Sequence, residues 1–303
     1  MEDYRQSEEY CRYYSKKGWT EKRVGSTRVL IKKILWLGSL IKIQRCSANT
    51  PLVELEKLAK KNRALLIVME FDVTTGDACY AELEESLSLC GYKDLNLFFS
   101  PTKTTYIDLT KSEEIILSSF DQDIRKSLRR NLKKNISFRL VSHIEEFYSL
   151  LYEAGHRRNY FVQNLHDWKD KWGSFGNQVQ VLLAYLDEKL LGGNMFIINP
   201  PIACGLFLPT TEYGRCNRIA ATLVWEGLKL AKKSGCTLFD LDGISDERYK
   251  PKKNWRGITT FKRKFRGREV EFMHPKVKIY SRYLKPLERL GLFWMFFDDS
   301  WGG

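Results

Sequence analysis

Residues 179–208, "VQVLLAYLDEKLLGGNMFIINPPIACGLFL", contain three apolar segments separated by polar and turn-forming residues. The first two segments, 179–186 and 190–198, flank the polar "DEK" and predict a β-hairpin. The third segment, 201–208, begins at the second of two consecutive prolines and predicts another strand. Together they predict a small antiparallel sheet.

Helical patterns surround this sheet. Residues 143–158 place apolar side chains at helical spacing, and 166–175 predict a second, shorter helix. Residues 219–235 predict a helix that ends at Gly235 after two lysines, as helix carboxyl ends prefer, and 236–243 predict a buried strand. This order of elements resembles the GNAT acyltransferase fold.

The first half of the chain repeats that order in a diverged form. The expected elements are a helix around 5–17, strands at 28–37 and 40–45, a helix at 51–61, a strand at 64–71 and a helix at 77–90. We therefore expect an α/β (α+β) protein of two tandem GNAT-like domains, with mixed, mostly antiparallel sheets flanked by helices.

The composition indicates a folded chain with an anionic partner. Of the 303 residues, 43% are hydrophobic, which is enough for a sizeable core, and the net charge is +13. Such an excess favours nucleic acid, nucleotide-linked substrates or an anionic membrane surface.

The cysteines and histidines favour neither disulfides nor a metal site. Seven cysteines include no CxxC pair, and four isolated histidines show no metal-ligand spacing. We therefore expect reduced thiols, no metal and no cofactor. We also expect a monomer in the cytoplasm, since the amino terminus is too polar for a signal peptide. The apolar run at 290–297 is too short to span a membrane.

A basic helix is predicted at 121–135, "DQDIRKSLRRNLKKN". Ile124, Leu128 and Leu132 would form its apolar stripe. The rest of its surface would be positive and contains no acid over 124–134, which suggests an RNA-binding surface rather than an ordinary solvated face. The candidate RNA-binding cations here are Arg125, Lys126, Arg129, Arg130, Lys133 and Lys134.

A second basic tract runs from Arg248 to Arg268, with ten basic residues in twenty-one and no acid. Aromatic residues interleave with these cations, a composition that suits unpaired RNA bases, although a flexible basic loop would also explain the charge. Its candidate RNA-binding residues are Lys252, Lys253, Arg256 and Lys264.

The centre of this tract is "FKRKF" at 261–265. Read as an extended strand, it would place Phe261, Arg263 and Phe265 on one face and two lysines on the other. The lysines would then project into a cleft, or alternatively protect a sheet edge from aggregation.

Several stretches together resemble the Fem aminoacyltransferases, which build peptidoglycan cross-bridges from aminoacyl-tRNA. They are "YRQSEEYCRYYSKKGW" at 4–19, the long segment 106–140, "LLAYLDEKLLGGNMFI", "LVWEGLKLAKKSGCTLFDLDGI" and "GITTFKRKF". Their joint order along the chain carries the resemblance. The resemblance implies an acceptor-side domain at 1–135, with 278–303 packing back on it, and an aminoacyl-tRNA-side domain at 136–277.

The resemblance also implies site residues. Lys262 matches the lysine of the family's FKxxF segment, and Asp72 in "MEFDV" matches an acid that faces the acceptor. Arg12 falls near a position that contacts acceptor phosphates. The substrate-binding candidates are Arg12, Phe261, Tyr213, Arg218 and Asp242. Two departures are Val73, where proline is common, and Asp242, where glycine is common.

The chemistry would be attack of an amine on the ester of aminoacyl-tRNA. Lys262 would stabilise the oxyanion, and Asp72 or solvent would accept the amine proton. The acceptor would be a lipid- or nucleotide-linked muropeptide precursor.

Two alternatives remain open on the same scaffold: an acyl-CoA-dependent N-acyltransferase and a non-catalytic RNA-binding protein. "RCNRIA" at 215–220 argues against the first, because Arg218 stands where a coenzyme A cradle needs glycine. Residues 283–297 suggest peripheral contact with the inner face of the plasma membrane, or packing on the first domain.

Overall fold

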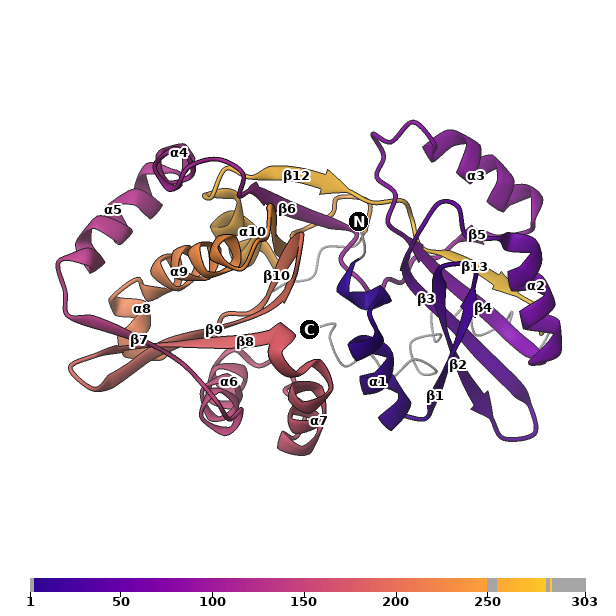
Figure 1. Ribbon diagram of the computed structural model, residues 1–303, viewed down its shortest axis with the longest axis horizontal. Helices are drawn as coiled ribbons and strands as arrows, with labels where there is room; N and C mark the ends of the chain where they lie inside the picture. The colour runs from indigo at the N-terminus through magenta and orange to yellow at the C-terminus, as the bar shows by residue number, and fades with distance from the viewer. Residues whose placement is uncertain (1–2, 250–254, 282–283, 285–303) are drawn as a thin grey trace. The chain divides into compact units, whose positions relative to one another are not determined.

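The computed structural model describes residues 3–249, 255–281 and 284. It divides the chain into two compact units. The carboxyl-terminal unit comprises 103–270, and the amino-terminal unit comprises the described part of 2–102 and 271–302 (Figure 1). In each unit helices cover a mixed sheet, which confirms the predicted α/β class.

The amino-terminal unit is built on a six-stranded sheet among the described residues. β1, β2 and β3 form an antiparallel meander, β3 pairs parallel with β4, and β13 and β5 continue the sheet antiparallel. In spatial order the strands are β1 (Trp19–Val24), β2 (Thr27–Ile34), β3 (Gly38–Cys46), β4 (Ala64–Phe71), β13 (Lys276–Ile279) and β5 (Lys93–Asp94).

Helices cover both faces of this sheet. A 3₁₀ turn, η1 (Tyr4–Gln6), precedes α1 (Glu8–Lys16), which begins at Ser7 because that hydroxyl accepts a hydrogen bond from the Tyr10 N–H. α1 buries Tyr10, Tyr13 and Tyr14 on one face. α2 (Leu52–Lys61) and α3 (Tyr80–Leu89) bury leucines against Ile41, Ile43 and the other residues of the opposite face.

The carboxyl-terminal unit is built on a seven-stranded sheet in the described part of the chain. All its assigned pairings are antiparallel except that of β10 with β11. In spatial order the strands are β12 (Arg268–Glu271), β6 (Lys103–Asp108), β11 (Leu238–Gly243), β10 (Ile202–Phe207), β9 (Lys189–Asn199), β8 (Val179–Leu186) and β7 (Ile136–Leu140).

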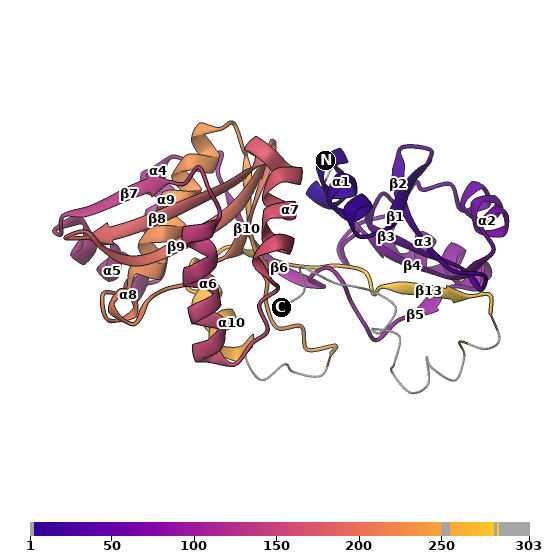
Figure 2. The same ribbon diagram turned by 90° about the horizontal axis from the view of Figure 1, so that it is seen from below.

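Two layers of helices enclose this sheet, as Figures 1 and 2 show. α4 (Glu113–Ser119), α5 (Gln122–Leu132) and α9 (Ile219–Lys233) share one core with the sheet. α6 (Glu145–Arg158) and α7 (Leu165–Phe175) lie on the other face (Figure 1). The shorter elements are α8 (Glu212–Cys216), the 3₁₀ turn η2 (Gly176–Gln178) and α10 (Trp255–Arg263).

The two sheets repeat one topology. Each has a three-stranded antiparallel meander whose last strand is joined through a helix to a parallel neighbour, β4 or β11. A distant segment then pairs antiparallel with that neighbour: β13 with β4, and β6 with β11. The internal repeat expected from element order is therefore present as a repeat of strand pairing.

The division between the units lies at Thr102/Lys103 rather than at the expected boundary of 135. The reason is that β6 pairs with β11, and that Ile124 and Leu128 of α5 lie in the same core as α9. The chain returns to the amino-terminal unit at Glu271, earlier than the expected 278. The last stretch of the expected return, 285–303, lies outside the described residues.

Two local expectations were wrong. "FKRKF" is not a strand: Phe261, Lys262 and Arg263 form the last turn of α10. Its apolar residues recur at helical spacing, and Phe261 and Phe265, four positions apart, pack edge to face at 5.3 Å between ring centroids. Leu132 is 77% exposed, because α5 ends at this residue and only Ile124 and Leu128 reach the core.

Candidate functional site

The parallel strands β10 and β11 separate part-way along their length. Ile202–Cys204 pair with Leu238–Asp240, and the pairing stops there although both strands continue. Beyond this point the pairing of β11 with β6 is irregular between Asp240 and Gly243, and Asp242 has a left-handed φ of +62°. Glycine adopts this conformation freely and aspartate is among the few other residues that tolerate it, which accounts for Asp242 standing where the Fem pattern has glycine.

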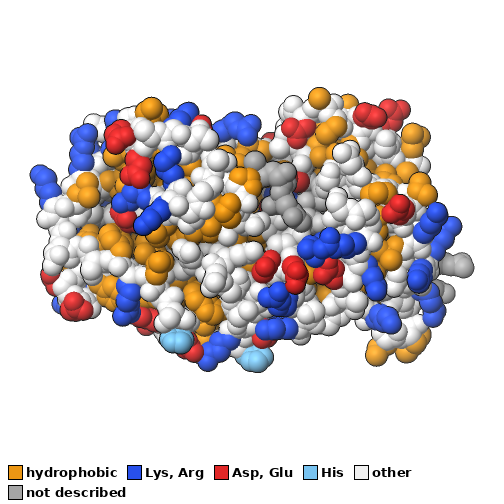
Figure 3. Space-filling view, in the orientation of Figure 1, with side chains coloured by type: hydrophobic (Ala, Val, Ile, Leu, Met, Phe, Trp, Pro, Cys, Tyr) orange, Lys and Arg blue, Asp and Glu red, His pale blue; other side chains and the backbone are white. Residues whose placement is uncertain are grey.

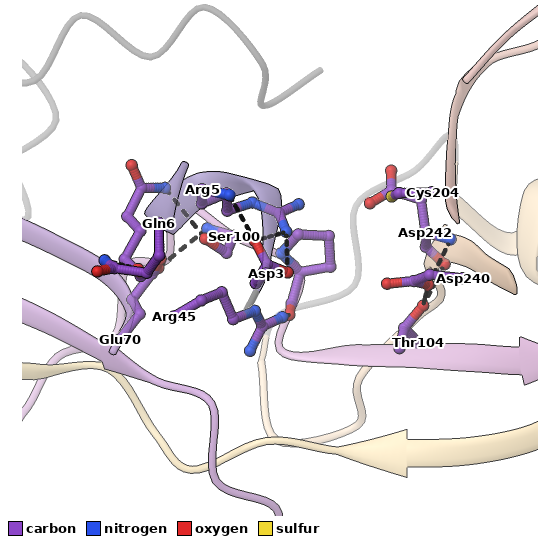
Figure 4. A network of polar contacts seen from close by, with 12 residues as sticks. Asp3, Arg5, Gln6, Arg45, Glu70, Ser100, Thr104, Cys204, Asp240 and Asp242 are labelled. Carbon is purple, nitrogen blue, oxygen red and sulfur yellow. Dashed lines mark hydrogen bonds and ion pairs between the residues drawn. The ribbon is translucent and has the colours of Figure 1, made fainter. Parts of the chain in front are cut away.

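Asp240 stabilises this irregular end of β11. Its carboxylate is buried and accepts hydrogen bonds from the Thr104 hydroxyl and, at 2.7 Å, from the Asp242 N–H (Figure 4). The Thr104 hydroxyl also lies 2.8 Å from the Asp242 carbonyl oxygen. Asp240 is therefore a structural residue, and Asp242 is held at the open end of β11.

Lys262 lies at the same end of β11. Its half-buried side chain reaches back from α10, and Nζ donates a hydrogen bond of 2.9 Å to the Gly243 carbonyl oxygen. Phe261 is partly buried against the core, and Phe265, which is 0% exposed, packs against Phe120 at 5.1 Å between ring centroids. The two rings anchor the end of α10 and so fix the position of the Lys262 ammonium.

The neighbouring cations are engaged differently. Arg263 forms an ion pair with Glu269 at 2.7 Å, and Lys264 forms one with Asp123 at 2.7 Å. Lys262 forms no ion pair with any described residue and is held only by a neutral carbonyl. Of the three cations of "FKRKF", Lys262 is the one able to meet a developing negative charge without first breaking an ion pair.

A pair of hydroxyls ties α10 to the segment after β11. The Thr259 hydroxyl accepts a 2.8 Å hydrogen bond from the Ser245 N–H and lies 2.9 Å from the Ser245 hydroxyl. Thr259 is the buried residue of this helix. The sequence analysis missed both residues, because nothing in their local pattern indicates that positions fourteen apart make contact.

Asp72 lies in the amino-terminal unit, at the turn after β4. Its N–H donates to the Cys46 carbonyl oxygen at 2.8 Å. The side chain reaches solvent, but the surrounding protein reduces its hydration, which raises the pKa of the carboxyl above 3.8, and the nearby Arg45 opposes this rise. An exposed carboxyl with a raised pKa has the properties of a general base.

Two arginines that the sequence analysis missed lie near Asp72. Arg45 is 5% exposed, and its guanidinium carbon lies 3.4 Å from the centroid of the Phe272 ring. Arg5 is 6% exposed and pairs with Asp3 at 3.0 Å (Figure 4). No local sequence signal distinguishes Arg45, because the segment 40–45, "LIKIQR", also contains Lys42 and Gln44.

The raised pKa predicts the pH dependence of an Asp72→Asn variant. In the wild type, the rate of the aminoacyl transfer that the Fem resemblance implies should rise as pH increases through the raised pKa of Asp72. The reason is that only the carboxylate form accepts a proton. The variant should lose this dependence and be slower by up to about 10²–10⁴-fold, the range for general-base catalysis. Initial rates measured between pH 4 and pH 8 would test this, and an unchanged pH profile would contradict the role.

The stability of the same variant provides a control. Because the pKa is raised in the native state, the stability that the Asp72 carboxyl contributes is present below pH 3.8 and lost as pH rises through the raised value. Asp72→Asn should therefore be at least as stable as the wild type at neutral pH. A thermal unfolding experiment that shows destabilisation would mean that lost activity reflects misfolding.

The other predicted substrate contacts are dispersed. Arg12 is exposed on α1 and pairs with Glu8 at 3.1 Å. Tyr213 is 43% exposed on the short helix α8. Arg218 precedes α9 with a left-handed φ of +53°. The described hydrogen bonds and ion pairs do not join these three residues to one another or to Lys262.

Most of the predicted RNA-binding cations at 125–134 are exposed, on α5 and on the two residues that follow it. Lys126, Arg129, Arg130 and Lys133 are exposed, whereas Arg125 and Lys134 are half-buried. Lys134 donates to the Asn217 side chain, which joins the end of α5 to the segment before α9. Arg256 is exposed on α10, Lys264 is engaged by Asp123, and Lys252 and Lys253 lie outside the described residues.

Neither a metal-binding cluster nor a membrane-spanning helix occurs in the described part of the chain. No group of three or more His, Cys, Asp or Glu side chains is arranged to hold a metal ion there. No helix in the same residues has the length and apolar character needed to cross a bilayer.

Comparison with known proteins identifies the fold. No family model and no curated protein matches the chain by sequence. The crystal structure of FemX matches with a TM-score of 0.82 and 16% identity over 94% of both chains. The C-terminal domain of a putative lysylphosphatidylglycerol synthetase from Agrobacterium fabrum matches with a TM-score of 0.59 and 13% identity, covering 95% of this chain and 91% of that one. L-PGS from Bacillus licheniformis matches with a TM-score of 0.58 and 11% identity, covering 91% and 88% respectively.

The likeness to FemX spans both units of the chain. It confirms, at the level of fold, the resemblance to the Fem proteins.

Proposed function

We propose that this protein is an aminoacyltransferase that moves an amino acid from aminoacyl-tRNA to the amine of a peptidoglycan precursor stem peptide. The observation that carries the proposal is the position of Lys262 on a FemX-like fold: a half-buried ammonium without an ion pair in the described structure, held by the Gly243 carbonyl oxygen at the end of β11. In the Fem pattern this lysine lies near the acyl ester.

The chemistry assigns a distinct role to each of two residues. The acceptor amine attacks the ester carbonyl carbon, a C–N bond forms, and the carbonyl oxygen gains negative charge that Lys262 stabilises. The C–O bond to the tRNA ribose then breaks, and the ribose oxygen leaves as a hydroxyl with the proton that the newly bonded nitrogen loses. Asp72 accepts the proton that the attacking ammonium must lose, a step that solvent can also perform.

The conformation of Arg218 favours aminoacyl-tRNA over acyl-coenzyme A. A coenzyme A cradle needs backbone N–H groups that approach a pyrophosphate closely, and glycine at the turn permits this approach. Here the turn before α9 has a left-handed residue with a large side chain, Arg218. The side chain adds bulk and a positive charge where the thioester cofactor would need open backbone.

The exposed cations of α5 provide a surface for the tRNA backbone. Arg129 and Lys133, one helical turn apart, form no ion pair with any described residue. Replacing both with glutamine should weaken tRNA binding and lower the slope of log affinity against log salt by about 0.7–0.9 for each phosphate that is no longer neutralised. Lys189→Gln, on the β8–β9 hairpin, is the matched control, and equal slopes in wild type and double variant would contradict the assignment.

A transfer assay tests the proposed function. The protein is incubated with tRNA charged with a labelled amino acid and with muropeptide precursors, and the label on the precursor is measured. Transfer supports the proposal; transfer that depends on acyl-CoA would replace it with the N-acyltransferase alternative. Binding of tRNA without transfer would replace it with the RNA-binding alternative.

A second acceptor belongs in the same assay. Two of the structural matches are named for lysylphosphatidylglycerol synthesis, and both cover most of this chain. Phosphatidylglycerol presented in vesicles would test a lipid hydroxyl as the acceptor. Label on this lipid, with none on the muropeptide, would retain aminoacyl transfer and overturn the assignment of the acceptor.

A further inference from the structure

The turn between β2 and β3 exposes three consecutive apolar residues. Leu35 is 88% exposed, Trp36 78% and Leu37 50%. Single exposed apolar residues are ordinary on protein surfaces, but three large ones at one hairpin tip are not. The hairpin projects at the lower right of Figure 1, and the space-filling view shows hydrophobic and basic side chains together at that edge (Figure 3).

The turn is held in place by the rest of its unit. The Leu37 N–H donates to the Ile34 carbonyl oxygen at 2.9 Å, and Ser39 donates from its backbone to the Arg63 carbonyl oxygen at 3.1 Å. Gly38 has a φ of +143°, and a Cβ at this position would lie 2.4 Å from that same Arg63 oxygen. The tip is therefore locked against the turn between α2 and β4.

Leu35 adopts an unfavourable backbone conformation although its side chain is mostly exposed. Its φ is +38°, a region that leucine rarely adopts and that asparagine or glycine would occupy at lower cost. Its side chain contributes almost nothing to the core, since it is 88% exposed. Neither the turn nor the core of the unit explains a leucine here, which points to a partner outside the unit.

Basic side chains surround the tip. Lys33 precedes it on β2, and the exposed Lys60, Lys61 and Arg63 come from the adjoining end of α2 and the following turn. These four cations form no ion pair with any described residue. We call Leu35, Trp36 and Leu37 the hairpin tip, and Lys33, Lys60, Lys61 and Arg63 the basic collar. The apolar hairpin tip is thus surrounded by positively charged side chains.

We propose that this hairpin tip inserts into the surface of an anionic lipid bilayer. Leucine side chains enter the acyl boundary, tryptophan prefers the headgroup level, and the basic collar contacts lipid phosphates. A protein partner fits less well, because a stable protein interface buries about 800 Å² on each side and needs more than a three-residue convex tip. This inference does not depend on the proposed transfer reaction.

The test is vesicle sedimentation of the full-length protein without tRNA. The wild type should bind phosphatidylcholine vesicles that contain phosphatidylglycerol and bind pure phosphatidylcholine vesicles more weakly. The triple variant Leu35→Ser, Trp36→Ser, Leu37→Ser should lose affinity for the mixed vesicles by at least about tenfold, because each apolar side chain removed forfeits transfer free energy. Val53→Ser with Leu89→Ser, which alters exposed apolar residues at 71% and 83% on the same unit, should bind as the wild type does.

A fluorescence measurement separates insertion from loose electrostatic contact. Brominated lipids should quench the wild type, and Trp36→Phe should lose this quenching, although seven other tryptophans of the chain's eight remain. Replacing the four collar residues with glutamine should remove the preference for anionic vesicles.

Three outcomes would overturn the proposal. The first is a wild type that ignores the mixed vesicles. The second is a triple variant that binds them as the wild type does, which would place the contact elsewhere in the chain. The third is self-association in sedimentation velocity that the triple variant abolishes, which would make a second copy the occupant. Circular dichroism of each variant would establish that it is folded.

Discussion

Replacing Lys262 with methionine should lower kcat by about 10²–10³-fold, the loss observed when one oxyanion-stabilising donor is removed. Methionine keeps the length and apolar stem of the side chain but lacks the charge. The Lys262 ammonium donates to a neutral carbonyl, so its removal leaves no unpaired carboxylate among the described residues. The fold should therefore survive the change, and single-turnover transfer from charged tRNA measures the effect.

Two matched variants define what the result means. Lys262→Arg keeps a cation near the Gly243 carbonyl and should recover part of the rate, whereas a purely steric role would give no such recovery. Lys189→Met removes an exposed lysine on the β8–β9 hairpin of the same unit and should leave kcat unchanged. If Lys262→Met is folded and transfers at the wild-type rate, the role assigned to this lysine is wrong.

Replacing Phe265 with alanine should destabilise the carboxyl-terminal unit by about 3–5 kcal/mol, as expected when a fully buried phenylalanine is removed. Phe265 is 0% exposed, and its ring packs against Phe120 at 5.1 Å and Phe261 at 5.3 Å between centroids. The change would leave a cavity where α10 meets the core. The measurement is the free energy of unfolding from a urea titration followed by circular dichroism.

The control for this variant is the same substitution at an exposed site. Phe161 is 87% exposed, and Phe161→Ala should change the free energy of unfolding by no more than about 0.5 kcal/mol. A small effect at Phe265 would show that this ring does not anchor α10. In that case the Lys262 ammonium would need another support.

The element order of the two units could be predicted from the sequence because it depends on local periodicity. The apolar segments 179–186 and 190–198 lie on either side of a polar turn and indicate a hairpin. The apolar residues at 219–233 recur at helical spacing and indicate a helix. The buried stripe of α5 was found in the same way, apart from Leu132 at the end of the helix. The repeated order of elements then predicted a tandem fold, and the strand pairing of the two units confirms that repeat.

Long-range contacts decided the rest. The pairing of β6 with β11 and of β13 with β4 moved the boundary between the units, and no local pattern encodes which distant strand becomes a neighbour. The buried Lys42 gives a further example. Its Nζ lies 3.9 Å from the centroid of the Tyr14 ring, a contact that forms only when α1 packs on β3.

The candidate site shows the same division. The sequence by itself identified a cationic segment flanked by phenylalanines, and only the resemblance to the Fem pattern singled out Lys262, because residue type alone does not distinguish it from Arg263 and Lys264. The tertiary structure distinguishes them by their ion pairs. Arg263 pairs with Glu269 on β12 and Lys264 pairs with Asp123 on α5, and both acids belong to other elements. The residue type alone determines that a side chain is positively charged. Whether that charge is already neutralised by an ion pair depends on which carboxylates the folded chain places beside it.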